Sequence, residues 1–382
     1  MKINNRKIVV VNQASNYLTV GFCNAFFNRF EDVSLITGSI HIQEEELDEA
    51  IKVTFINRWV ERPAHKKIWA YLLGCWKIFW LLKTKFKKHE VFFVSIPPMA
   101  YLLNIILPNK FSMVIWDVFP DAFKITGMKE SHPVYRIWKN LNKKSFKKSY
   151  KLFTIGENMS EALSQYVDKD KILIQPIWSI FQENNKVNKH ENPFIQKNNL
   201  QGKFVIQYSG NIGLSHNVEH LVELAELMRN DEGIIFQIIG RGPRVPFLKK
   251  MVSEKQLPNC HFLPFQTDDM FPFSLSAADI GVVILDEKTS KGSVPSKSYN
   301  LMSYGIPSLY LASNDSELHI YSKKYQHAEC FESEELGRAR DFILSLIHDK
   351  EKWNLYSANA IKASRFFKRE NADLFIQKYL AD

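Results

Sequence analysis

Residues 204–228 read FVIQYSGNIGLSHNVEHLVELAELM, and this stretch decides the fold class. The apolar run that begins at Phe204 predicts a buried strand, and apolar residues recur at helical spacing from about Asn217 onward. Two glycines, Gly210 and Gly213, occupy the turn between them. Such glycines let backbone N–H groups approach a phosphate, and the N-terminus of the following helix adds partial positive charge. A tight turn also needs glycine for its own geometry, so this turn alone leaves a purely structural interpretation open.

Outside this stretch, strands and helices alternate along almost the whole chain. Short β-branched or aromatic runs predict strands that begin at Lys7, Val33, Lys52, Glu90, Met113, Leu152, Ile172, Phe204, Ile234, His261, Ile280 and Ser308. The segments between them include expected helices over 17–30, 64–88, 132–149 and 160–167. Near-continuous apolar strands that alternate with helices are typical of parallel sheets covered on both faces.

The length and one change in composition predict two domains. A chain of 382 residues exceeds what one hydrophobic core usually serves. Residues 181–199 are polar and rich in Asn and Lys, as expected for a linker. We therefore expect an α/β protein with two Rossmann-like, doubly wound parallel-sheet domains over 1–180 and 200–364 and a cleft between them. A C-terminal helix over 365–382 is expected to pack back on the first domain. In such sheets ligands bind beyond the carboxyl ends of the strands.

Composition and motifs exclude several classes of protein. The four cysteines lie far apart with no CxxC pair, which argues against a zinc module or a disulfide scaffold and fits a reducing compartment. No segment matches the GxxxxGK[ST] pattern of a phosphate-loop ATPase. No Cys/His cluster predicts a metal site, and no Ser/His/Asp order or cysteine motif predicts covalent catalysis.

The net charge of +9 is unevenly distributed. Residues 58–90 hold nine bases and two acids, and residues 129–151 hold eight bases and one acid. These two segments carry +14, so the rest of the chain carries −5. A basic segment of this kind contacts nucleic acid, a membrane surface or an anionic substrate. No nucleic-acid-binding motif accompanies the charge, and the lysines flank long apolar helices, so nucleic acid is not expected as a partner.

The first basic segment contains an apolar run over 68–82 that Lys77 interrupts. This run is too short to span a bilayer, which needs about 20 residues. Its tryptophans share one broad helical face, and lysines flank both ends. Two interpretations stay open: a core helix that packs on a sheet, or a face that lies on anionic lipid. The second predicts a membrane-facing, acceptor-side surface made by Trp69, Trp76, Lys77, Trp80 and Lys83.

Three further loops that follow predicted strands suit an anionic ligand. Arg241 lies between two glycines in IGRGP (239–243), where it offers a cation. In VPSKSYN (294–300), Ser296 and Lys297 stand at an expected helix start and could bind a diphosphate, although a plain N-cap explains Ser296 equally well. Phe265, in the loop 264–266, marks a place where a nucleotide base could meet the backbone.

Taken in order, YSGNIGLSHNVEHLVEL, FQIIGRGP, NCHFLPF, AADIGVVIL and VPSKSYNLMSYGIP resemble the C-terminal domain of retaining family-4 glycosyltransferases with the GT-B fold. The closest resemblance is to the bacterial group that builds capsule, colanic-acid-like or O-antigen polysaccharides. In the first half, IWDVFPD (115–121) and TIGENM (154–159) are similar to two loops of that group.

The resemblance implies a hexosyl- or N-acetylhexosaminyl-transferase that moves a sugar from a nucleotide-diphosphate donor, a UDP-sugar, to a lipid-linked saccharide acceptor with retention of configuration. It implies no metal and no other cofactor. The implied location is cytoplasmic and peripheral, on the anionic inner face of the plasma membrane. Asp117 becomes the candidate for proton handling at the attacking hydroxyl. The implied donor-binding residues are Gly210, Asn211, Gly213, His216, Arg241, Phe265, Ser296, Lys297 and Asn300.

The sequence departs from the family pattern at four positions. Asn211 and His216 stand where arginine and lysine are common, and Gly292 and Asn300 stand where the family has two glutamates. The segment NQASN (12–16) also replaces the usual glycine-rich loop near the N-terminus. An alternative function on the same fold is a nucleotide-sugar epimerase or hydrolase. That chemistry needs acid–base carboxylates and histidines, which are scarce at the predicted strand ends.

Overall fold

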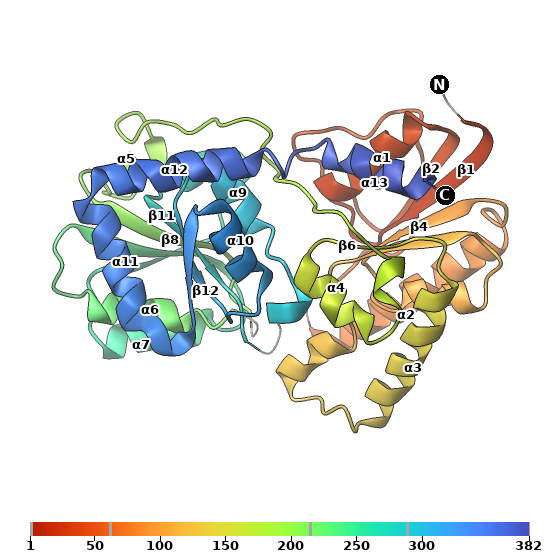
Figure 1. Ribbon diagram of the computed structural model, residues 1–382, viewed down its shortest axis with the longest axis horizontal. Helices are drawn as coiled ribbons and strands as arrows, with labels where there is room; N and C mark the ends of the chain where they lie inside the picture. The colour runs from red at the N-terminus through yellow and green to blue at the C-terminus, as the bar shows by residue number, and fades with distance from the viewer. Residues whose placement is uncertain (1–2, 61–62, 214–215, 288–289, 382) are drawn as a thin grey trace. The chain divides into compact units, whose positions relative to one another are not determined.

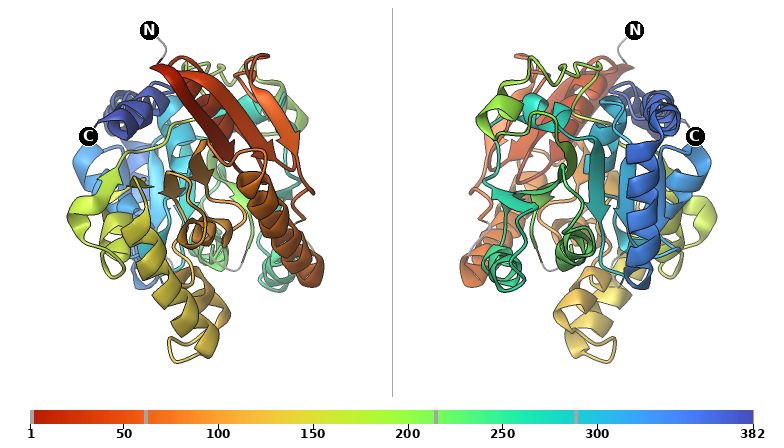
Figure 2. Two further views of the ribbon diagram at one scale, coloured as in Figure 1. Left: turned by 90° about the vertical axis from the view of Figure 1, so that its right-hand side faces the viewer. Right: turned by 90° about the vertical axis from the view of Figure 1, so that its left-hand side faces the viewer.

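The computed structural model describes residues 3–60, 63–213, 216–287 and 290–381. The chain divides into two compact units, which Figures 1 and 2 show as ribbons. The first unit consists of residues 1–180 together with 368–382, and the second consists of residues 181–367.

The first unit is built on a seven-stranded sheet in the order β3-β2-β1-β4-β5-β6-β7, with every neighbouring pair parallel. Its strands are β1 (Ile3–Val11), β2 (Phe30–Thr37), β3 (Lys52–Phe55), β4 (Glu90–Val94), β5 (Phe111–Ile115), β6 (Leu152–Thr154) and β7 (Ile172–Ile174). Its helices are α1 (Tyr17–Phe27), α2 (Ala64–Lys83), η1 (Ala100–Ile105), η2 (Asp121–Thr126), α3 (Pro133–Lys148), α4 (Glu157–Ser164), η3 (Lys169–Lys171) and α13 (Asn371–Leu380).

Successive apolar residues in the strands cover both faces of this sheet, because side chains alternate along a strand. On β4, Phe92 packs against Phe26 of α1 and Tyr379 of α13, while Phe93 packs against Tyr101 of η1. The two helices α1 and α13 lie side by side, although the chain between them spans the second unit (Figure 1). The C-terminal segment is therefore part of the first unit's core.

The second unit has a six-stranded sheet in the order β10-β9-β8-β11-β12-β13, again wholly parallel. Its strands are β8 (Phe204–Asn211), β9 (Ile234–Arg241), β10 (Cys260–Leu263), β11 (Ile280–Ile284), β12 (Ser308–Leu311) and β13 (Ala328–Phe331). Its helices are α5 (Pro193–Lys197), α6 (Glu219–Leu227), α7 (Val245–Glu254), α8 (Phe271–Ser276), η4 (Ser290–Gly292), α9 (Lys297–Ser303), α10 (Glu317–Tyr325), η5 (Ser333–Glu335), α11 (Leu336–His348) and α12 (Lys350–Ser364).

This sheet is also buried on both faces. Ile206 and Phe236 belong to the main core, which α6, α7 and α11 cover, whereas Val205 and Ile239 pack against α5 and α8. The strand order reverses beside β1 in the first unit and beside β8 in the second. Loops that follow these strands are where a doubly wound sheet binds ligands. The predicted fold class of two doubly wound parallel sheets is confirmed.

Several element boundaries differ from those expected. Helix α2 ends at Lys83 rather than at Lys88, because the Thr84 hydroxyl bonds back to the Trp80 carbonyl (2.6 Å) and Phe86 turns into the core. Residues 181–199 are not extended throughout: α5 forms there and buries two apolar side chains in the second unit. Strand β13 was not expected from the sequence.

Candidate functional site

The turn after β8 is locked to the turn after β9 by close backbone approach. Gly210 and Gly240 are register partners at the ends of the two strands. A Cβ atom on Gly240 would lie 1.9 Å from the Gly210 carbonyl oxygen, and one on Gly242 would lie 2.0 Å from that of Ile212. Gly240 and Gly242 are therefore required by packing alone, whether or not a ligand binds.

The Lys297 side chain reaches from the first residue of α9 toward the turn after β8. Its ammonium nitrogen lies 3.9 Å from the centre of the Tyr208 ring, and a Cβ atom on Gly210 would lie 3.0 Å from that nitrogen. The nitrogen is buried and has no hydrogen-bond partner among the described residues. Burial lowers the pKa of Lys297 to about 7, because a charge loses solvation when it leaves water. An anion beside Gly210 would supply the counter-charge.

Asn211 and His216 converge on the second glycine of this turn. A Cβ atom on Gly213 would lie 3.1 Å from Asn211 Nδ2 and 3.6 Å from His216 Nδ1. Burial and the neighbouring Lys297 charge lower the pKa of His216 to about 3, so the imidazole is neutral at physiological pH. Within this group, Lys297 is the residue that brings positive charge to the turn.

A cavity of about 20 Å³ lies beside Lys297, and Gln207, Ser209 and Asn300 are among its lining residues. This volume holds about one water molecule. Gln207 Oε1 is buried with no hydrogen-bond partner among the described residues. The structure thus brings Asn300 to the same cavity as Lys297, as the sequence analysis expected of two donor-binding residues. The structure also places Gln207 and Tyr208 at this site, and neither was predicted from the sequence. The sequence feature that could have indicated them is a polar and an aromatic residue inside an otherwise apolar strand.

Arg241 and Phe265 lie together at the ends of the adjacent strands β9 and β10. The Arg241 guanidinium lies 5.2 Å from the centre of the Phe265 ring, and 54% of the Phe265 side chain is exposed. An exposed ring next to a cation can stack on a planar base. Ser296 is exposed at the N-cap position of α9, where its side chain makes no capping hydrogen bond within the described residues.

In the first unit, Asp117 lies two residues beyond the end of β5 and is exposed. Desolvation by the surrounding protein raises the pKa of Asp117 to about 7, and the Lys67 charge opposes that rise. Because the residue is open to solvent, a substrate hydroxyl could reach its carboxyl group. A carboxyl group that titrates near neutrality suits acid–base chemistry.

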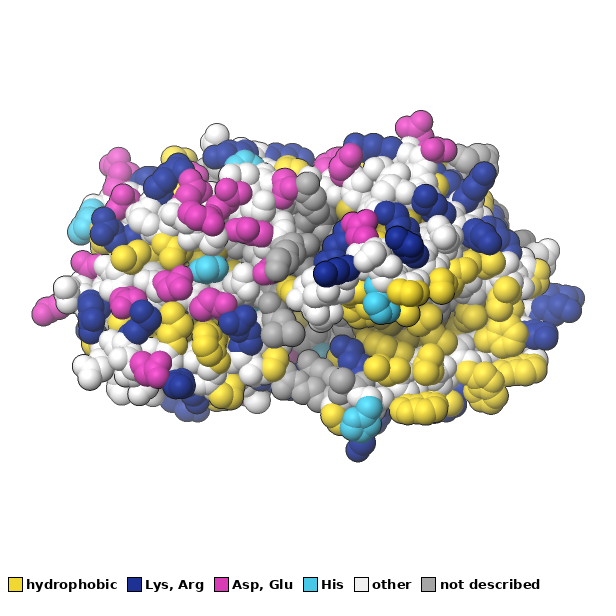
Figure 3. Space-filling view, turned by 90° about the horizontal axis from the view of Figure 1, so that it is seen from below, with side chains coloured by type: hydrophobic (Ala, Val, Ile, Leu, Met, Phe, Trp, Pro, Cys, Tyr) yellow, Lys and Arg dark blue, Asp and Glu magenta, His cyan; other side chains and the backbone are white. Residues whose placement is uncertain are grey.

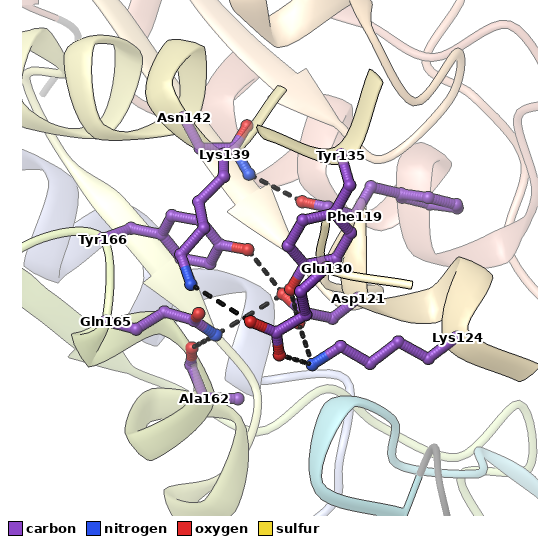
Figure 4. Close-up of polar contacts among 10 residues, drawn as sticks. All are labelled: Phe119, Asp121, Lys124, Glu130, Tyr135, Lys139, Asn142, Ala162, Gln165 and Tyr166. Atoms are coloured by element: carbon purple, nitrogen blue, oxygen red, sulfur yellow. Dashed lines mark hydrogen bonds and ion pairs between the residues drawn. The ribbon is translucent and has the colours of Figure 1, made fainter. Parts of the chain in front are cut away.

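The nearby Asp121 is committed to structure (Figure 4). Its carboxylate accepts hydrogen bonds from the hydroxyls of Tyr166 (2.5 Å) and Tyr135 (2.7 Å) and pairs with Lys124 (2.9 Å). These contacts outweigh burial and hold the pKa of Asp121 below its usual range. Asp121 thereby ties η2 to α3 and to the segment after α4, which leaves Asp117 as the acid of this loop available for chemistry.

Helix α2 turns its aromatic face away from the sheet. Trp69 is 70% exposed, Trp76 59% and Trp80 44%, whereas the sheet side of the helix carries the small or aliphatic Ala70 and Ile78. Figure 3 shows hydrophobic side chains gathered over one side of the first unit, with Lys and Arg side chains at the border. The interpretation that this aromatic face packs in the core is therefore wrong.

Two lysines of α2 lie beside its aromatic face. Lys77 is half-buried, and the Lys83 ammonium lies 5.4 Å from the centre of the Trp80 ring.

The second basic segment, residues 129–151, is different, because part of its charge stabilises the fold. Lys148 donates to the carbonyls of Asn104 (2.7 Å) and Leu107 (3.0 Å) at the end of η1. The excess charge at residues 129–151 is thus partly structural.

Comparisons with known proteins place the chain among glycosyltransferase-like sequences and folds. Residues 188–363 match the family described as glycosyl transferases group 1. The match spans all six strands of the second sheet, from β8 to β13, and includes every candidate donor-binding residue. It covers the second unit and does not extend to the Asp117 loop or to α2.

Two curated relatives match part of the chain. WbjE of Pseudomonas aeruginosa, named a probable glycosyltransferase, is 28% identical over 222 residues, which are 57% of this chain and 54% of WbjE. WcaI of Escherichia coli (strain K12), named as a candidate colanic acid biosynthesis glycosyl transferase, is 30% identical over 163 residues, which are 42% of this chain and 40% of WcaI. The chain therefore matches about half the length of these relatives.

Solved structures match the chain almost completely. WaaG, described as a glycosyltransferase involved in lipopolysaccharide biosynthesis, has a TM-score of 0.72 at 12% identity, over 98% of this chain and 100% of WaaG. Anabaena Alr3699/HepE in complex with UDP and glucose has a TM-score of 0.72 at 13% identity, over 98% and 99%. At such identities the likeness shows the fold, which is GT-B.

None of the described helices is long and apolar enough to cross a membrane. No group of three or more His, Cys, Asp or Glu side chains in the described part of the chain is placed to hold a metal ion.

Proposed function

We propose that the protein is a glycosyltransferase that moves a sugar from a UDP-sugar to a lipid-linked saccharide acceptor, with retention of configuration, in surface-polysaccharide biosynthesis. The observation that carries the proposal is the buried Lys297 ammonium beside the Gly210 turn, at the point where the strand order of the second sheet reverses. Departure of a nucleoside diphosphate develops negative charge, and a preorganised cation in a water-poor site stabilises it.

The other donor contacts follow from the same strand ends. Gly210, Asn211 and Gly213 would present the turn to the phosphates, and Ser296 would add a hydroxyl at the start of α9. Arg241 and the exposed Phe265 ring suit the nucleotide base, and Asn300 suits the ribose. The presence of UDP in a structure with the same fold supports a uridine nucleotide. We assign no metal to the reaction, since the buried lysine can supply the positive charge.

The acceptor side is assigned to the first unit. Asp117 is exposed and its pKa is raised toward neutrality, so we propose that it accepts the proton of the attacking hydroxyl. The aromatic face of α2, with Trp69, Trp76 and Trp80 outward and Lys77 and Lys83 beside them, is proposed to lie on the anionic inner face of the plasma membrane. The names of WcaI and WaaG, which refer to colanic acid and to lipopolysaccharide biosynthesis, support a role in surface polysaccharide synthesis.

The transfer reaction is tested with a panel of nucleotide sugars and a lipid-diphosphate saccharide acceptor in vesicles. We expect one UDP-sugar to give a lipid-linked product, with one UDP released per sugar transferred. Lys297→Ala and Arg241→Ala should each lower transfer, while Lys249→Ala, an exposed lysine on α7, should not. Unchanged transfer in both site variants would refute the site assignment, and UDP release without acceptor would favour a hydrolase instead.

Membrane docking is tested separately by co-sedimentation with neutral and anionic vesicles. We expect binding to anionic vesicles that weakens with salt, because surface charges are screened within about 10 Å at 0.1 M ionic strength. Trp76→Gln should reduce it, and Phe247→Gln, a similarly exposed aromatic residue of the second unit, should not. Equal partition onto both lipids, or none, would overturn the membrane assignment.

A further inference from the structure

We propose that a groove beside α2 binds one hydrocarbon chain of the acceptor lipid. The inference deepens the proposed function, on which its choice of ligand rests. The groove, here called the α2 groove, has a volume of about 630 Å³. It is lined by Asn57, Arg58, Val60, Trp69, Ala70, Leu72, Leu73 and Trp76.

Hydrogen bonds from Gln13 and Asn57 hold the wall of the α2 groove in place. Gln13 donates through Nε2 to the carbonyls of Asn57 (3.1 Å) and Ala70 (3.0 Å), and Asn57 Nδ2 donates to the Ala70 carbonyl (2.9 Å). A Cβ atom on Gly74 would lie 2.8 Å from Gln13 Nε2, so the helix needs glycine there to approach this glutamine. The loop 57–60 and the helix are thus held together before any ligand arrives, which lowers the entropic cost of binding.

The chemistry of the lining favours a hydrocarbon. Six of its eight residues are apolar, and the amide of Asn57 already donates within the protein. Trp69, Leu72, Leu73 and Trp76 remain between 42% and 70% exposed, so a large apolar area is in contact with water. Exposed apolar side chains that gather in one groove are candidates for a binding surface. An alkyl or isoprenoid chain would cover these apolar side chains and would itself bring no polar group that needs a hydrogen-bond partner.

The charge of one lining residue indicates where the phosphate end of the bound lipid would lie. Arg58 is exposed and is the one charged residue in the described lining of the α2 groove, which suits the phosphate end of a lipid. The first turns of α2 also lie close to the candidate catalytic loop, since the Lys67 charge acts on Asp117 and the Asp117 charge acts on Tyr71. A lipid whose chain occupies the α2 groove can therefore present its phosphate and sugar near Asp117.

The experiment measures binding of alkyl phosphates with six, eight, ten and twelve carbons, each below its micelle concentration, by titration calorimetry without vesicles. Burial of one methylene is worth about 0.8 kcal/mol, so each two added carbons should tighten binding by about 15-fold until the α2 groove is full. Inorganic phosphate alone should bind far more weakly than the twelve-carbon compound. Equal binding of phosphate and of every alkyl phosphate would overturn the proposal.

Two variants separate the α2 groove from general apolar contact. Leu73→Gln, at an exposed position of the lining, should flatten the dependence on chain length. Ile106→Gln, an exposed residue of the first unit outside the lining, should leave that dependence intact. The proposal fails if the two variants behave alike, or if sedimentation shows that the face is covered by a second copy of the chain that alkyl phosphates do not displace.

The test is independent of catalysis, because it needs neither donor nor transfer. If sugar transfer occurs but chain length does not affect binding, the groove proposal is wrong and the proposed function stands. If the length of the alkyl group affects binding but no sugar donor is used, the proposed function is wrong. The α2 groove would then bind a lipid that is not a glycosyl acceptor.

Discussion

Replacing Lys297 by Met should stabilise the ligand-free protein and weaken its binding of UDP at the same time. Methionine fills a similar volume without a charge, so the buried site no longer opposes folding. The same change removes the cation that we assign to the diphosphate. A residue kept only for packing would not show these opposite effects.

The magnitude follows from the pKa of the buried ammonium. A fall from 10.5 to about 7 corresponds to about 5 kcal/mol against folding at pH 6, at about 1.4 kcal/mol per pKa unit. Contact with the Tyr208 ring offsets about 1–2 kcal/mol of this, and partial exposure of the side chain offsets more. We therefore expect Lys297→Met to gain about 2 kcal/mol, which is about 4–8 °C in Tm for a unit of this size.

The gain should depend on pH in a defined direction. Between pH 7 and 10.5 the unfolded chain binds a proton at Lys297 that the folded chain does not, so wild-type stability rises with pH through this window. Lys297→Met lacks that rise. Its advantage should therefore be full below pH 7 and nearly lost above pH 10.

The assay is urea unfolding at pH 6 and pH 9.5, with and without UDP, together with direct titration of UDP. Loss of a charged contact worth about 1.5–3 kcal/mol should raise the Kd for UDP by about 10- to 100-fold. Lys249→Met serves as the matched control on an exposed lysine of the same unit. The reasoning is refuted if Lys297→Met destabilises the protein at both pH values, or if UDP binds as tightly as before.

Three other changes test neighbouring parts of the structure. Gly240→Ala should destabilise the second unit by more than about 3 kcal/mol in urea unfolding, because the new Cβ atom would meet the Gly210 carbonyl. The control Gly337→Ala lies in open space on α11 and should raise the free energy of unfolding by a few tenths to about 1 kcal/mol. Asp117→Asn should lower kcat by about 10²–10⁴-fold with UDP affinity unchanged, and wild-type activity should fall as the pH drops below about 7; a lost UDP affinity would contradict the role. Asp121→Asn should lower the free energy of unfolding of the first unit by about 2 kcal/mol at pH 7. Because the pKa of Asp121 in the folded protein is held below 3.8, the stability difference between wild type and variant should disappear as the pH falls below that value. A constant difference down to pH 2 would show that the carboxylate charge is not its cause.

The sheets were predictable from the sequence because their strands are apolar on both faces. Every strand in the described residues except β13 coincides with a predicted run. Strand β13 reads AECF, without a β-branched residue, and lies at the edge of its sheet with β12 as its one partner. Such a strand is fixed by its neighbour rather than by its own composition.

The candidate site was predictable only in part. Glycines and charged residues after strands identified loops that the structure places at the strand ends, since strand periodicity fixes where a strand ends. The direction of Lys297 was not predictable, because it depends on how α9 packs beside β8. Helix α2 shows the same limit: its pattern predicts one aromatic face, but periodicity does not say which face meets the sheet. Ala70, Gly74 and Ile78 meet it because Gln13 requires a close approach.

The position of the cation on α9 has a consequence for how the site is built. An arginine or lysine on the β8 turn would remain solvated in the free protein, and its charge would cost little. Lys297 instead projects from a helix onto the ring of Tyr208, and the turn that it faces carries the neutral Asn211 and His216. Desolvation of the Lys297 ammonium lowers the stability of the ligand-free protein, and a bound diphosphate would offset this by supplying the counter-charge. The second unit is therefore expected to gain more stability from the donor than it would with a solvated cation, so that occupancy of the donor site and rigidity of the β8–β9 turns rise together.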